Sequence, residues 1–515
     1  MLADPPISAE ELAALEAAGL GEVGAKLLRR IEHDRQEIDR RDVKLEKLSF
    51  EIAQLRRLKF GKKSEQLDGE QRALFDEAVD ADIAAAEAQL QELLGKKKPP
   101  ASPGAAPKRA ALPANLPRVD RHHEPENTTC ACGCALKRIG EDVSEKLDYT
   151  PGVFTVERHI RGKWACAQCR TLSQAPVPAE IIDKGLPTAG LLAQVLVAKY
   201  ADHLPLYRQE AIFGRAGVAL PRSTLGAWLG ICGLRLQPLV DALKAHLLAC
   251  PVVHADETPV AMLSPGSGKT HRAYLWAYAA GAFEPLRAVV YDFTESRAGE
   301  HARAFLGDWR GSLVCDDYSG YKASFALGVT EAGCMAHARR KFVELHQANK
   351  STIAAAAIEL IGQLYGVERE VKLLSAQRRL HERRTRAAPI AKALHDWLLA
   401  QRGKITDGTA TAKAIDYSLN RWAALTRYLN DPALPIDNNH DEQQIRPWAT
   451  GRKNWLFAGT LLAGQRAAAI MSLIQSAKLN GHDPYAYLKD VLQRLPTQRA
   501  RDIGELLPHH WVPAI

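Results

Sequence analysis

Apolar residues near the N-terminus recur every seven positions along a segment rich in helix-forming residues, residues 24–60. Four residues mark the repeat: Ile31, Ile38, Leu45 and Ile52. A second apolar stripe begins late, at Leu48 and Leu55, because Asp34 and Arg41 occupy its earlier positions. The pattern predicts either a short self-associating coiled coil or an amphipathic helix that packs on its own protein.

The first half of the chain then divides by composition. A second helical stretch, rich in Ala and Glu, completes an N-terminal helical and coiled-coil region over residues 1–95. Residues 96–118 are dense in Pro, Ala and Lys, which is typical of an extended linker. A cysteine-rich module is expected over residues 119–182, followed by a helical block over residues 183–248.

Residues 211–229 within the helical block combine an apolar helix end with a glycine-containing turn. Ser223 or Thr224 is then suitably placed to cap a second helix. This layout predicts either a DNA-binding helix-turn-helix or a plain helical bundle, which produces the same pattern.

The pattern changes after residue 250, where short apolar, β-rich runs replace helical periodicity. Four strands are expected, at residues 251–255, 273–280, 287–293 and 312–315, with a helix at residues 298–307 before the fourth. This order predicts a ribonuclease-H-like α/β core over residues 249–466, within which residues 338–432 are expected to be almost entirely helical. A C-terminal helical region follows over residues 467–515, so the fold class is multidomain α/β plus α.

Length and charge narrow the class of protein. A chain of 515 residues is too long for one core, so three or more domains are expected. No run of eighteen apolar residues occurs, which argues against a membrane protein, and the acidic N-terminus lacks a targeting pattern. A cytoplasmic protein is therefore expected. The formal net charge of +8 is modest and does not by itself indicate a nucleic-acid partner.

Acidic residues follow two of the expected strands. Asp256 is placed at the end of the first strand and Asp316 directly after the fourth, so both should lie at one edge of the sheet. Glu442, on a helix that Asp437 could cap, is the best third carboxylate. Three converging carboxylates are the ligands that two Mg²⁺ or Mn²⁺ ions need for phosphoryl transfer on DNA.

The assignment within each acidic pair stays open at this point, because Glu257 adjoins Asp256 and Asp317 adjoins Asp316. Each acid taken alone is more simply explained as an ordinary surface residue. The set, in this order and on these elements, favours a catalytic site.

Several long motifs in one order resemble the insertion-sequence sixty-six family of bacterial transposases, over nearly the whole chain. They are RRLKFGKKSEQL, IGEDVSEKLDYTPGVFTVERHIRGKWAC, HADETPV, DDYSGY, GCMAHARRKF, DNNHDEQQIRPWATGRKNWLFAG and LIQSAKLNGHDPYAYLKDVL. The resemblance implies a transposase of the DDE type, with Asp256, Asp316 and Glu442 as its three acids. It also implies a helical insertion, at about 345–432, between Asp316 and Glu442. Asp317 departs from the family pattern, which usually has Gly there, and Gln443 stands where Arg or Asn is usual.

The cysteine module suits a structural zinc ion. Cys166 and Cys169 have CxxC spacing, and a CxCxC cluster precedes them at Cys130, Cys132 and Cys134. Four of these five thiols would complete a tetrahedral Zn²⁺ site and leave one spare. The resemblance also implies zinc here, with Cys132 as the family's second cysteine. The alternative is a metal-free module with buried thiols.

Basic and aromatic residues offer candidate contacts with DNA. Arg446, Arg452, Lys453 and Trp455 lie on or just after the Glu442 helix, where cations could bind phosphates and Trp455 could stack on a base. Core packing is the rival explanation for Trp455 and Phe457.

His337 and Arg340 lie on another helix, and Cys334 with His337 forms a CxxH pair of a kind found near the active site in several DDE groups. A lone histidine is more often structural. Five arginines between positions 378 and 386 either lie along DNA or solvate a helix. The PGSGKT stretch at 265–270 lacks the first glycine of a phosphate-binding loop and predicts a hairpin turn.

Together these features predict the transposase of an insertion sequence, which cuts DNA at the element's ends and joins them to target DNA. Its expected partners are the terminal inverted repeats, the target DNA, further copies of the chain in a synaptic complex and accessory proteins of the element; when bound to DNA it would be nucleoid-associated. The alternatives are a non-catalytic zinc and coiled-coil DNA-binding protein, an inactive transposase relic, or a nuclease without strand transfer.

Overall fold

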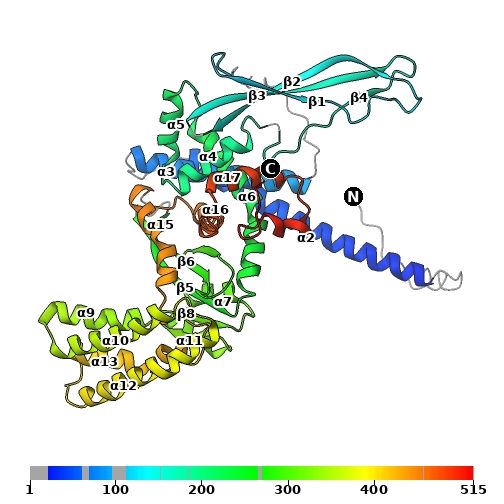
Figure 1. Ribbon diagram of the computed structural model, residues 1–515. Coiled ribbons are helices and arrows are strands. Elements are labelled where there is room, and N and C mark those ends of the chain that lie inside the picture. Colours follow the sequence, from blue (N-terminus) through cyan, green and yellow to red (C-terminus); the bar gives the residue numbers. More distant parts are fainter. Residues whose placement is uncertain are drawn as a thin grey trace. The chain divides into compact units, whose positions relative to one another are not determined.

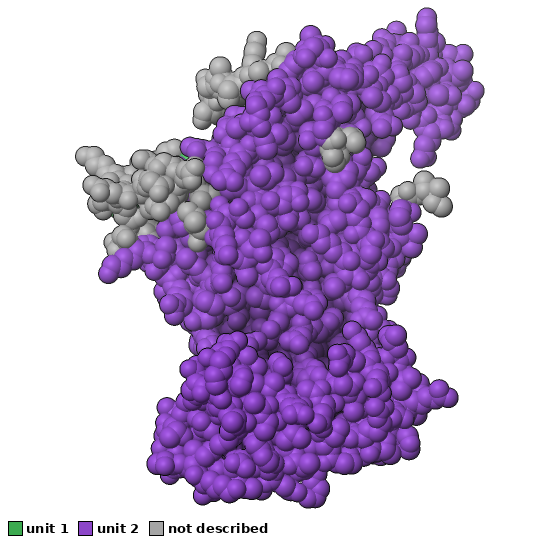
Figure 2. Space-filling model, turned by 60° about the vertical axis from the view of Figure 1, so that its left-hand side comes forward, with its two compact units in different colours: residues 1–63, 83–108 green, residues 64–82, 109–515 purple. Residues whose placement is uncertain are grey.

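The structure is a computed structural model that describes residues 21–60, 69–94, 112–150, 152–183, 185–264, 269–455 and 457–513. Residues 96–111 of the expected linker and residues 265–268 of the PGSGKT turn lie outside the described residues. The chain forms two compact units, residues 1–63 with 83–108 and residues 64–82 with 109–515. The second unit is the purple surface in Figure 2. Helix α3 therefore contributes its first part to the second unit.

The first unit consists of helix α2 (Gly21–Phe60) and the later part of helix α3 (Gly69–Leu94). Leu48 and Ile52 are buried against Ala86 and the partly buried Leu90 and Leu93. Ion pairing of Arg56 with Glu87 fixes the antiparallel register of the two helices. The later heptads of α2 thus pack on their own chain, whereas Ile31 and Ile38 are 58% and 56% exposed.

A long β-hairpin dominates the cysteine module. Strands β2 (Leu136–Thr150) and β3 (Val153–Cys166) pair antiparallel, and β1 (Arg118–His123) joins the other side of β3 in parallel. The short strand β4 (Leu172–Gln174) pairs with the end of β3 that carries Cys166.

A five-stranded mixed sheet in the second unit has the strand order β7-β6-β5-β8-β9. Figure 1 labels strands β6, β5 and β8 of this sheet. Its strands are β5 (Val252–Ser264), β6 (Lys269–Ala280), β7 (Val289–Thr294), β8 (Ser312–Cys315) and β9 (Thr330–Gly333). The first three pair antiparallel, and β8 and β9 then add in parallel to β5.

The apolar runs correctly located four of these strands and helix α7 (Gly299–Leu306). The fifth strand, β9, was missed because its sequence, TEAG, has neither an apolar run nor an alternating pattern. A mixed α/β fold is confirmed.

Helices surround this sheet. Before it come α4 (Ala189–Tyr200), α5 (Leu206–Arg215) and α6 (Arg222–Leu247). Helix α8 (Lys322–Ala326) lies between β8 and β9. After β9 come α9 (Met335–Asn349), α10 (Thr352–Val371), α11 (Ala376–Glu382), α12 (Ala388–Arg402), α13 (Ala410–Asn420) and α14 (Trp422–Thr426). The last helices are α15 (Asn439–Trp455), α16 (Leu461–Leu479) and α17 (Pro484–Arg494).

Helix α6 (Arg222–Leu247) begins two residues earlier than a Ser223 cap requires. Pro221 is its N-cap residue, so Ser223 and Thr224 lie inside the first turn and the expected cap is wrong. Proline, with φ fixed near its helix-entry value, starts this helix without a side-chain acceptor. Along its length α6 buries Leu236, Val240 and further apolar residues in the main core.

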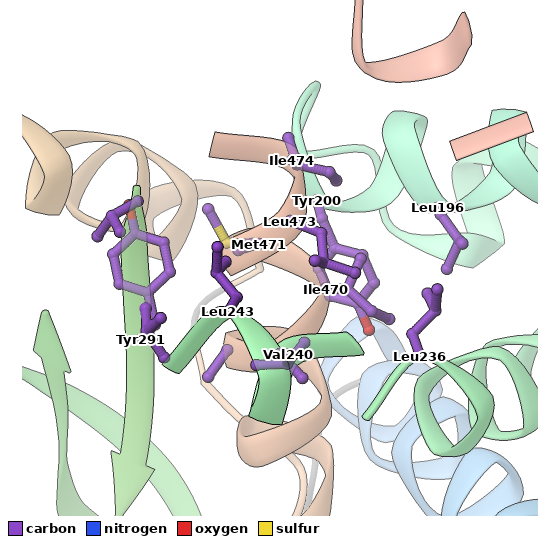
Figure 3. Close-up of a cluster of buried hydrophobic side chains, with 14 of the residues drawn as sticks. Leu196, Tyr200, Leu236, Val240, Leu243, Tyr291, Ile470, Met471, Leu473 and Ile474 are labelled. Atoms are coloured by element: carbon purple, nitrogen blue, oxygen red, sulfur yellow. The ribbon is translucent and has the colours of Figure 1, made fainter. Parts of the chain in front are cut away.

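Helix α16 joins the sheet to the preceding helices. Ile470, Met471, Leu473 and Ile474 are buried in one cluster with residues of α4, α6 and β7 (Figure 3). The helix crosses position 466–467, where a domain boundary was expected. Among the described residues, no helix is long and apolar enough to cross a membrane.

The same helix also covers the edge of the sheet. The Ser472 and Ser476 hydroxyls accept hydrogen bonds from the backbone N–H groups of Tyr291 and Val289 on the edge strand β7. Four residues of helix rise about 6 Å and two residues of strand about 6.6 Å, so the two spacings match. An edge that would otherwise pair with another chain is thereby satisfied.

Candidate functional site

The ends of the β5–β8 ladder bring Asp256 and Asp316 to one place. The parallel pairing stops at His254 opposite Val314, and each acid follows two residues later. Asp316 leaves its strand as expected, but Asp256 does not, because β5 continues to Ser264. The expectation that the first strand ends at Asp256 is wrong, since the chain beyond it stays paired with β6 as a hairpin.

Asp256 lies in an environment that disfavours a negative charge. Burial, and then the neighbouring Glu257, Asp316 and Glu442 carboxylates, raise the pKa of Asp256 to about 8. The Glu257 backbone N–H, donating to Oδ1 at 2.8 Å, opposes this shift without overcoming it. A buried carboxylate surrounded by like charges is typical of a site that binds a cation.

The second acid of each pair has a structural partner. Glu257 forms an ion pair with Arg297, and the Tyr321 hydroxyl donates to its other oxygen at 2.8 Å. Asp317, 42% exposed, lies 3.4 Å from Arg421. The same guanidinium donates to the Asp316 carbonyl oxygen at 3.1 Å and so holds the end of β8.

Glu442 lies in the first turn of α15, the helix expected to carry it. Its Oε2 lies 3.4 Å from Arg340 and its Oε1 3.8 Å from His337 Nδ1. Oε1 is buried and has no hydrogen-bond partner among the described residues. One possible ligand atom each from Glu442, Cys334 and His337 lies within 4.8 Å of the other two. Among the described residues, Asp256, Asp316 and Glu442 do not form such a group.

Asn438 connects the two acid-bearing elements and was not identified from the sequence. It is fully buried, and its amide accepts from His254 Nδ1 at 2.7 Å and donates to the Ala255 carbonyl at 2.9 Å. Its own carbonyl accepts from the N–H groups of Asp441 and Glu442 at the start of α15. The residue before Asp256 and the helix of Glu442 are therefore held by one side chain.

Asp441 is a second residue that sequence reasoning did not identify. Its side chain is fully buried, and within the described residues neither carboxyl oxygen has a hydrogen-bond partner. Burial, reinforced by Asp256 and Glu257, raises its pKa well above the usual value. The Asp441 carboxyl group therefore lies close enough to Asp256 and Glu257 for their charges to disfavour its ionised form.

A cleft of about 440 Å³ opens beside Asp316. Acids, cations and aromatic or hydroxyl side chains line it: Arg297, Asp316, Asp317, Tyr318, Ser319, His337, Arg340, Lys341, Glu344 and Tyr417. Two sequence-predicted residues, His337 and Arg340, share this cleft with Asp316. A surface of this composition can offer a polyanion cationic contacts next to carboxylates.

The other predicted DNA contacts lie along α15. Arg446 and Lys453 are exposed, whereas Arg452 donates to Thr258 and to the Pro259 carbonyl at 2.9 Å and is thereby fixed to β5. Trp455, half-buried, packs edge-on against Trp448.

The arginines between positions 378 and 386 do not form one surface. Arg383 is fully buried in an ion pair with Glu368, and Arg379 is buried while donating to the Pro432 carbonyl. Arg386 pairs with Glu370. At least Arg379 and Arg383 hold the helices together and are not available to DNA.

Four of the five module cysteines converge. Sulfur–sulfur distances are 3.0 Å for Cys130–Cys169, 3.6 Å for Cys132–Cys166 and 3.8 Å for Cys132–Cys169. Tetrahedral zinc with Zn–S bonds of about 2.3 Å separates its sulfurs by about 3.8 Å, so this set fits the ion. Cys134 is the spare thiol and points to the Gln168 side chain.

Local backbone and hydrogen bonds prepare this cluster for metal. Gly133 (φ 84°) and Arg170 (φ 57°) turn the two cysteine-bearing loops. Hydrogen bonding to Thr171, and then to Cys130, lowers the pKa of Cys169 to about 6, which favours the thiolate that zinc requires.

Family models match four parts of the chain. One described as "Transposase IS66 family" matches residues 184–466, and the "IS66 C-terminal element" matches residues 472–509. The "zinc-finger binding domain of transposase IS66" matches residues 127–170, and "Transposase C of IS166 homeodomain" matches residues 47–121. The four-cysteine cluster and this zinc-finger match together support a structural zinc ion.

Full-length relatives are similar along most of the chain. The uncharacterized protein y4jD of Sinorhizobium fredii is 38% identical over 90% of this chain and 94% of its own length. From the same organism, y4qI is 37% identical (89% of this chain, 88% of its own) and y4hP is 32% identical (91% and 88%).

Proposed function

Because the chain belongs to the IS66 family of transposases, we propose that it cleaves DNA at the ends of a bacterial insertion sequence and transfers the strands to target DNA. Asp256, Asp316 and Glu442 are the proposed catalytic acids. The observation that carries the proposal is the alignment of Asp256 and Asp316 at the end of the β5–β8 ladder, with Glu442 close enough to affect the charge of Asp256.

The sheet supports a ribonuclease-H-like core. Three antiparallel strands, a helix and two further parallel strands give the order β7-β6-β5-β8-β9, with the acids at the ends of the two central strands. Helices α9–α14 lie between β9 and α15 in the chain and would be the insertion. We propose the domain ranges expected from the sequence with two changes: residues 64–82 belong to the second unit, and the last boundary does not interrupt α16.

The donor set fits hard divalent cations such as Mg²⁺ or Mn²⁺. All three side chains are carboxylates, burial and mutual repulsion destabilise the charge of Asp256, and Glu442 Oε1 has no partner within the described chain. Two such ions, when bound, activate the attacking oxygen and stabilise the leaving oxygen of a phosphodiester.

The protein's own groups would orient the acids and the DNA. The Tyr318 backbone N–H donates to Asp316 Oδ1 at 2.9 Å and fixes this carboxylate. Arg297 neutralises Glu257, which leaves Asp256 as the acid of that pair without a cationic side-chain partner among the described residues. Arg340 and Lys341 line the cleft beside Asp316 and would bind the phosphates of the cleaved strand.

Other parts of the chain would recognise and assemble the ends. DNA binding is implied by the transposase and zinc-finger matches. We assign the terminal inverted repeats to the zinc module with helices α4–α6, and target DNA to the surface carrying Arg446 and Lys453. The exposed Ile31 and Ile38 stripe of α2 would pair copies of the chain in a synaptic complex, with accessory proteins of the element as further partners.

The test is cleavage and strand transfer on DNA carrying the ends of the element that encodes this chain. Asp256→Asn, Asp316→Asn and Glu442→Gln should each lower the rate about a hundredfold or more in Mg²⁺, because a lost metal ligand removes several kcal/mol of transition-state stabilisation. Binding of the same DNA should persist.

Asp317→Asn is the matched control, since it removes an exposed charge next to Asp316 and should leave most of the activity. Full activity of Asp256→Asn or Glu442→Gln would contradict the site assignment. DNA binding that needs zinc, with no cleavage in Mg²⁺ or Mn²⁺, would instead identify a non-catalytic binder or an inactive relic.

A further inference from the structure

Two further metal-binding side chains, Cys334 and His337, meet one of the proposed catalytic acids, Glu442. Cys334 precedes the first residue of α9, His337 lies in its first turn and Glu442 lies in the first turn of α15. One ligand atom from each lies within 4.8 Å of the other two. We propose that Cys334, His337 and Glu442 bind a divalent transition-metal ion of the zinc class.

Two atoms of this group lack the hydrogen bonds that buried polar atoms normally make. His337 Nδ1 and Glu442 Oε1 are buried, 3.8 Å apart, and neither has a hydrogen-bond partner in the described part of the chain. The large majority of buried side-chain polar atoms in proteins have a hydrogen-bond partner. An ion between these two atoms would satisfy both at once.

The third ligand is already oriented. Cys334 is fully buried, and the Asn438 backbone N–H donates to its sulfur at 3.2 Å. Hydrogen bonds of this kind orient metal-binding groups and stabilise a thiolate. Metal binding displaces the thiol proton to solvent.

The chemistry of the three donors selects the ion. One sulfur, one imidazole nitrogen and one carboxylate oxygen suit Zn²⁺ or Co²⁺, whereas Mg²⁺ prefers oxygen ligands alone. Three protein ligands leave a fourth position for water or another group. Arg340, 3.4 Å from Glu442 Oε2, is the resident cation that the ion would have to outcompete.

The consequence for the reaction rests on the proposed function. Glu442 is at once a ligand of this site and a proposed ligand of the catalytic Mg²⁺. An ion bound to Cys334 and His337 holds Glu442 against α9, so zinc and magnesium compete for it. Zinc therefore inhibits cleavage, and removing the thiol relieves the inhibition.

The experiment uses the full chain with zinc retained in its four-cysteine module. Bound zinc per chain is measured by elemental analysis after equilibration with Zn²⁺, and added Co²⁺ is followed by its thiolate charge-transfer absorption in the near ultraviolet. Cys334→Ser and His337→Gln should each bind about one ion fewer than the wild type and lose this added cobalt absorption.

Cys232→Ser and Cys134→Ser are the matched thiol controls. Cys232 is buried elsewhere, Cys134 is the spare module cysteine, and both variants should keep the wild-type number of ions. If Cys334→Ser does not fold, His337→Gln decides, because this side chain is 21% exposed on a helix and tolerates a polar replacement. Wild-type stoichiometry in the folded variants would overturn the proposed site.

A second readout separates this proposal from the proposed function. In Mg²⁺-dependent cleavage, added Zn²⁺ should inhibit the wild type at least about tenfold more strongly than Cys334→Ser. If the variants bind one ion fewer but Zn²⁺ does not inhibit the wild type, the proposed competition is overturned, whereas the proposed metal site is retained. Absence of cleavage by every form would overturn the proposed function, while the stoichiometry would still decide the site.

Discussion

Asp256 shows how a single residue can be kept in an unfavourable position. Its carboxyl group is half-buried among Glu257, Asp316 and Glu442, and its pKa is raised to about 8 from the usual 3.8, mainly by burial. Between these values the folded chain holds a proton that the unfolded chain has released. The free energy of unfolding therefore falls as pH rises from about 4 to about 8.

Asp256→Asn should remove this dependence. In magnesium-free buffer, the melting temperature of the variant minus that of the wild type should be about 2–6 °C higher at pH 8 than at pH 6. Added Mg²⁺ should stabilise the wild type at pH 8 but not the variant, because the ion replaces the repulsion with attraction. Differential scanning calorimetry at the two pH values measures both effects.

Asp317→Asn is again the control, since this acid is exposed and paired with Arg421. For Asp317→Asn, the change in melting temperature between pH 6 and pH 8 should be close to the change seen in the wild type. Identical pH profiles for Asp256→Asn and the wild type would show that the carboxyl group titrates normally.

The sequence alone could not decide which acid of each neighbouring pair is the site residue, or which cysteine is spare. Asp256, Asp316 and Glu442 could be proposed because apolar runs precede both aspartates and the motifs occur in the family's order, although β5 does not end at Asp256. The choice within each pair depends on Arg297 and Arg421, which reach Glu257 and Asp317 from distant positions. The spare thiol could not be chosen either, because Cys130 and Cys134 differ in the fold and not in chemistry.

At the level of elements, the local sequence pattern predicted where each strand lies better than it predicted where each strand ends. Strand β8 was found at its observed bounds because Ser312–Cys315 is a buried apolar run. Strand β5 was cut short at Asp256, since the polar residues beyond it are held by pairing with β6. The role of Asn438 had no local signal, because it depends on contacts with His254 and Ala255, far away in the sequence.

Asn438 provides the second prediction. Asn438→Ala leaves the His254 ring nitrogen and the Ala255 carbonyl without their present partner, so stability should fall by about 2–4 kcal/mol. The start of α15 would also move relative to β5, which should raise the Mg²⁺ concentration needed for half-maximal cleavage. Thermal unfolding and a magnesium titration measure the two effects separately.

The neighbouring asparagine supplies a matched control. Asn439 is exposed and its side chain donates to Asp437, so Asn439→Ala should cost less than about 0.5 kcal/mol. A change in magnesium dependence for Asn438→Ala but not Asn439→Ala identifies positioning of the acids. Equal behaviour of the two variants would show that Asn438 does not connect the two elements.

At the level of the whole molecule, the first part of α3 is built into the second unit. Asp82 is fully buried in an ion pair with Arg466, at 2.9 Å, and also accepts from the Thr460 hydroxyl. Lys199 pairs with Glu77 at 3.0 Å. The family models separate residues 47–121 from residues 184–466, yet these contacts make one structure of parts of both.

Close backbone packing makes this union testable with one methyl group. A Cβ at Gly230, on α6, would lie 2.0 Å from the Ala81 carbonyl oxygen of α3. Because backbone cannot move aside cheaply, Gly230→Ala should destabilise the second unit by about 1–3 kcal/mol and release residues 69–82 from α6. Thermal unfolding and limited proteolysis at α3 measure the two consequences.

Gly214 is the matched control because it too lies within a helix, α5, and a Cβ there would meet nothing within 4 Å among the described residues. Gly214→Ala should stabilise the protein by about 0.5–1 kcal/mol, since alanine is the better helix former. If the two Gly→Ala substitutions change the free energy of unfolding with opposite signs, the contact of Gly230 with α3 accounts for the difference. If Gly230→Ala also stabilised the protein and left α3 protected, the docking of α3 on α6 would be refuted, and the N-terminal helices would then be free to act apart from the sheet that carries the acids.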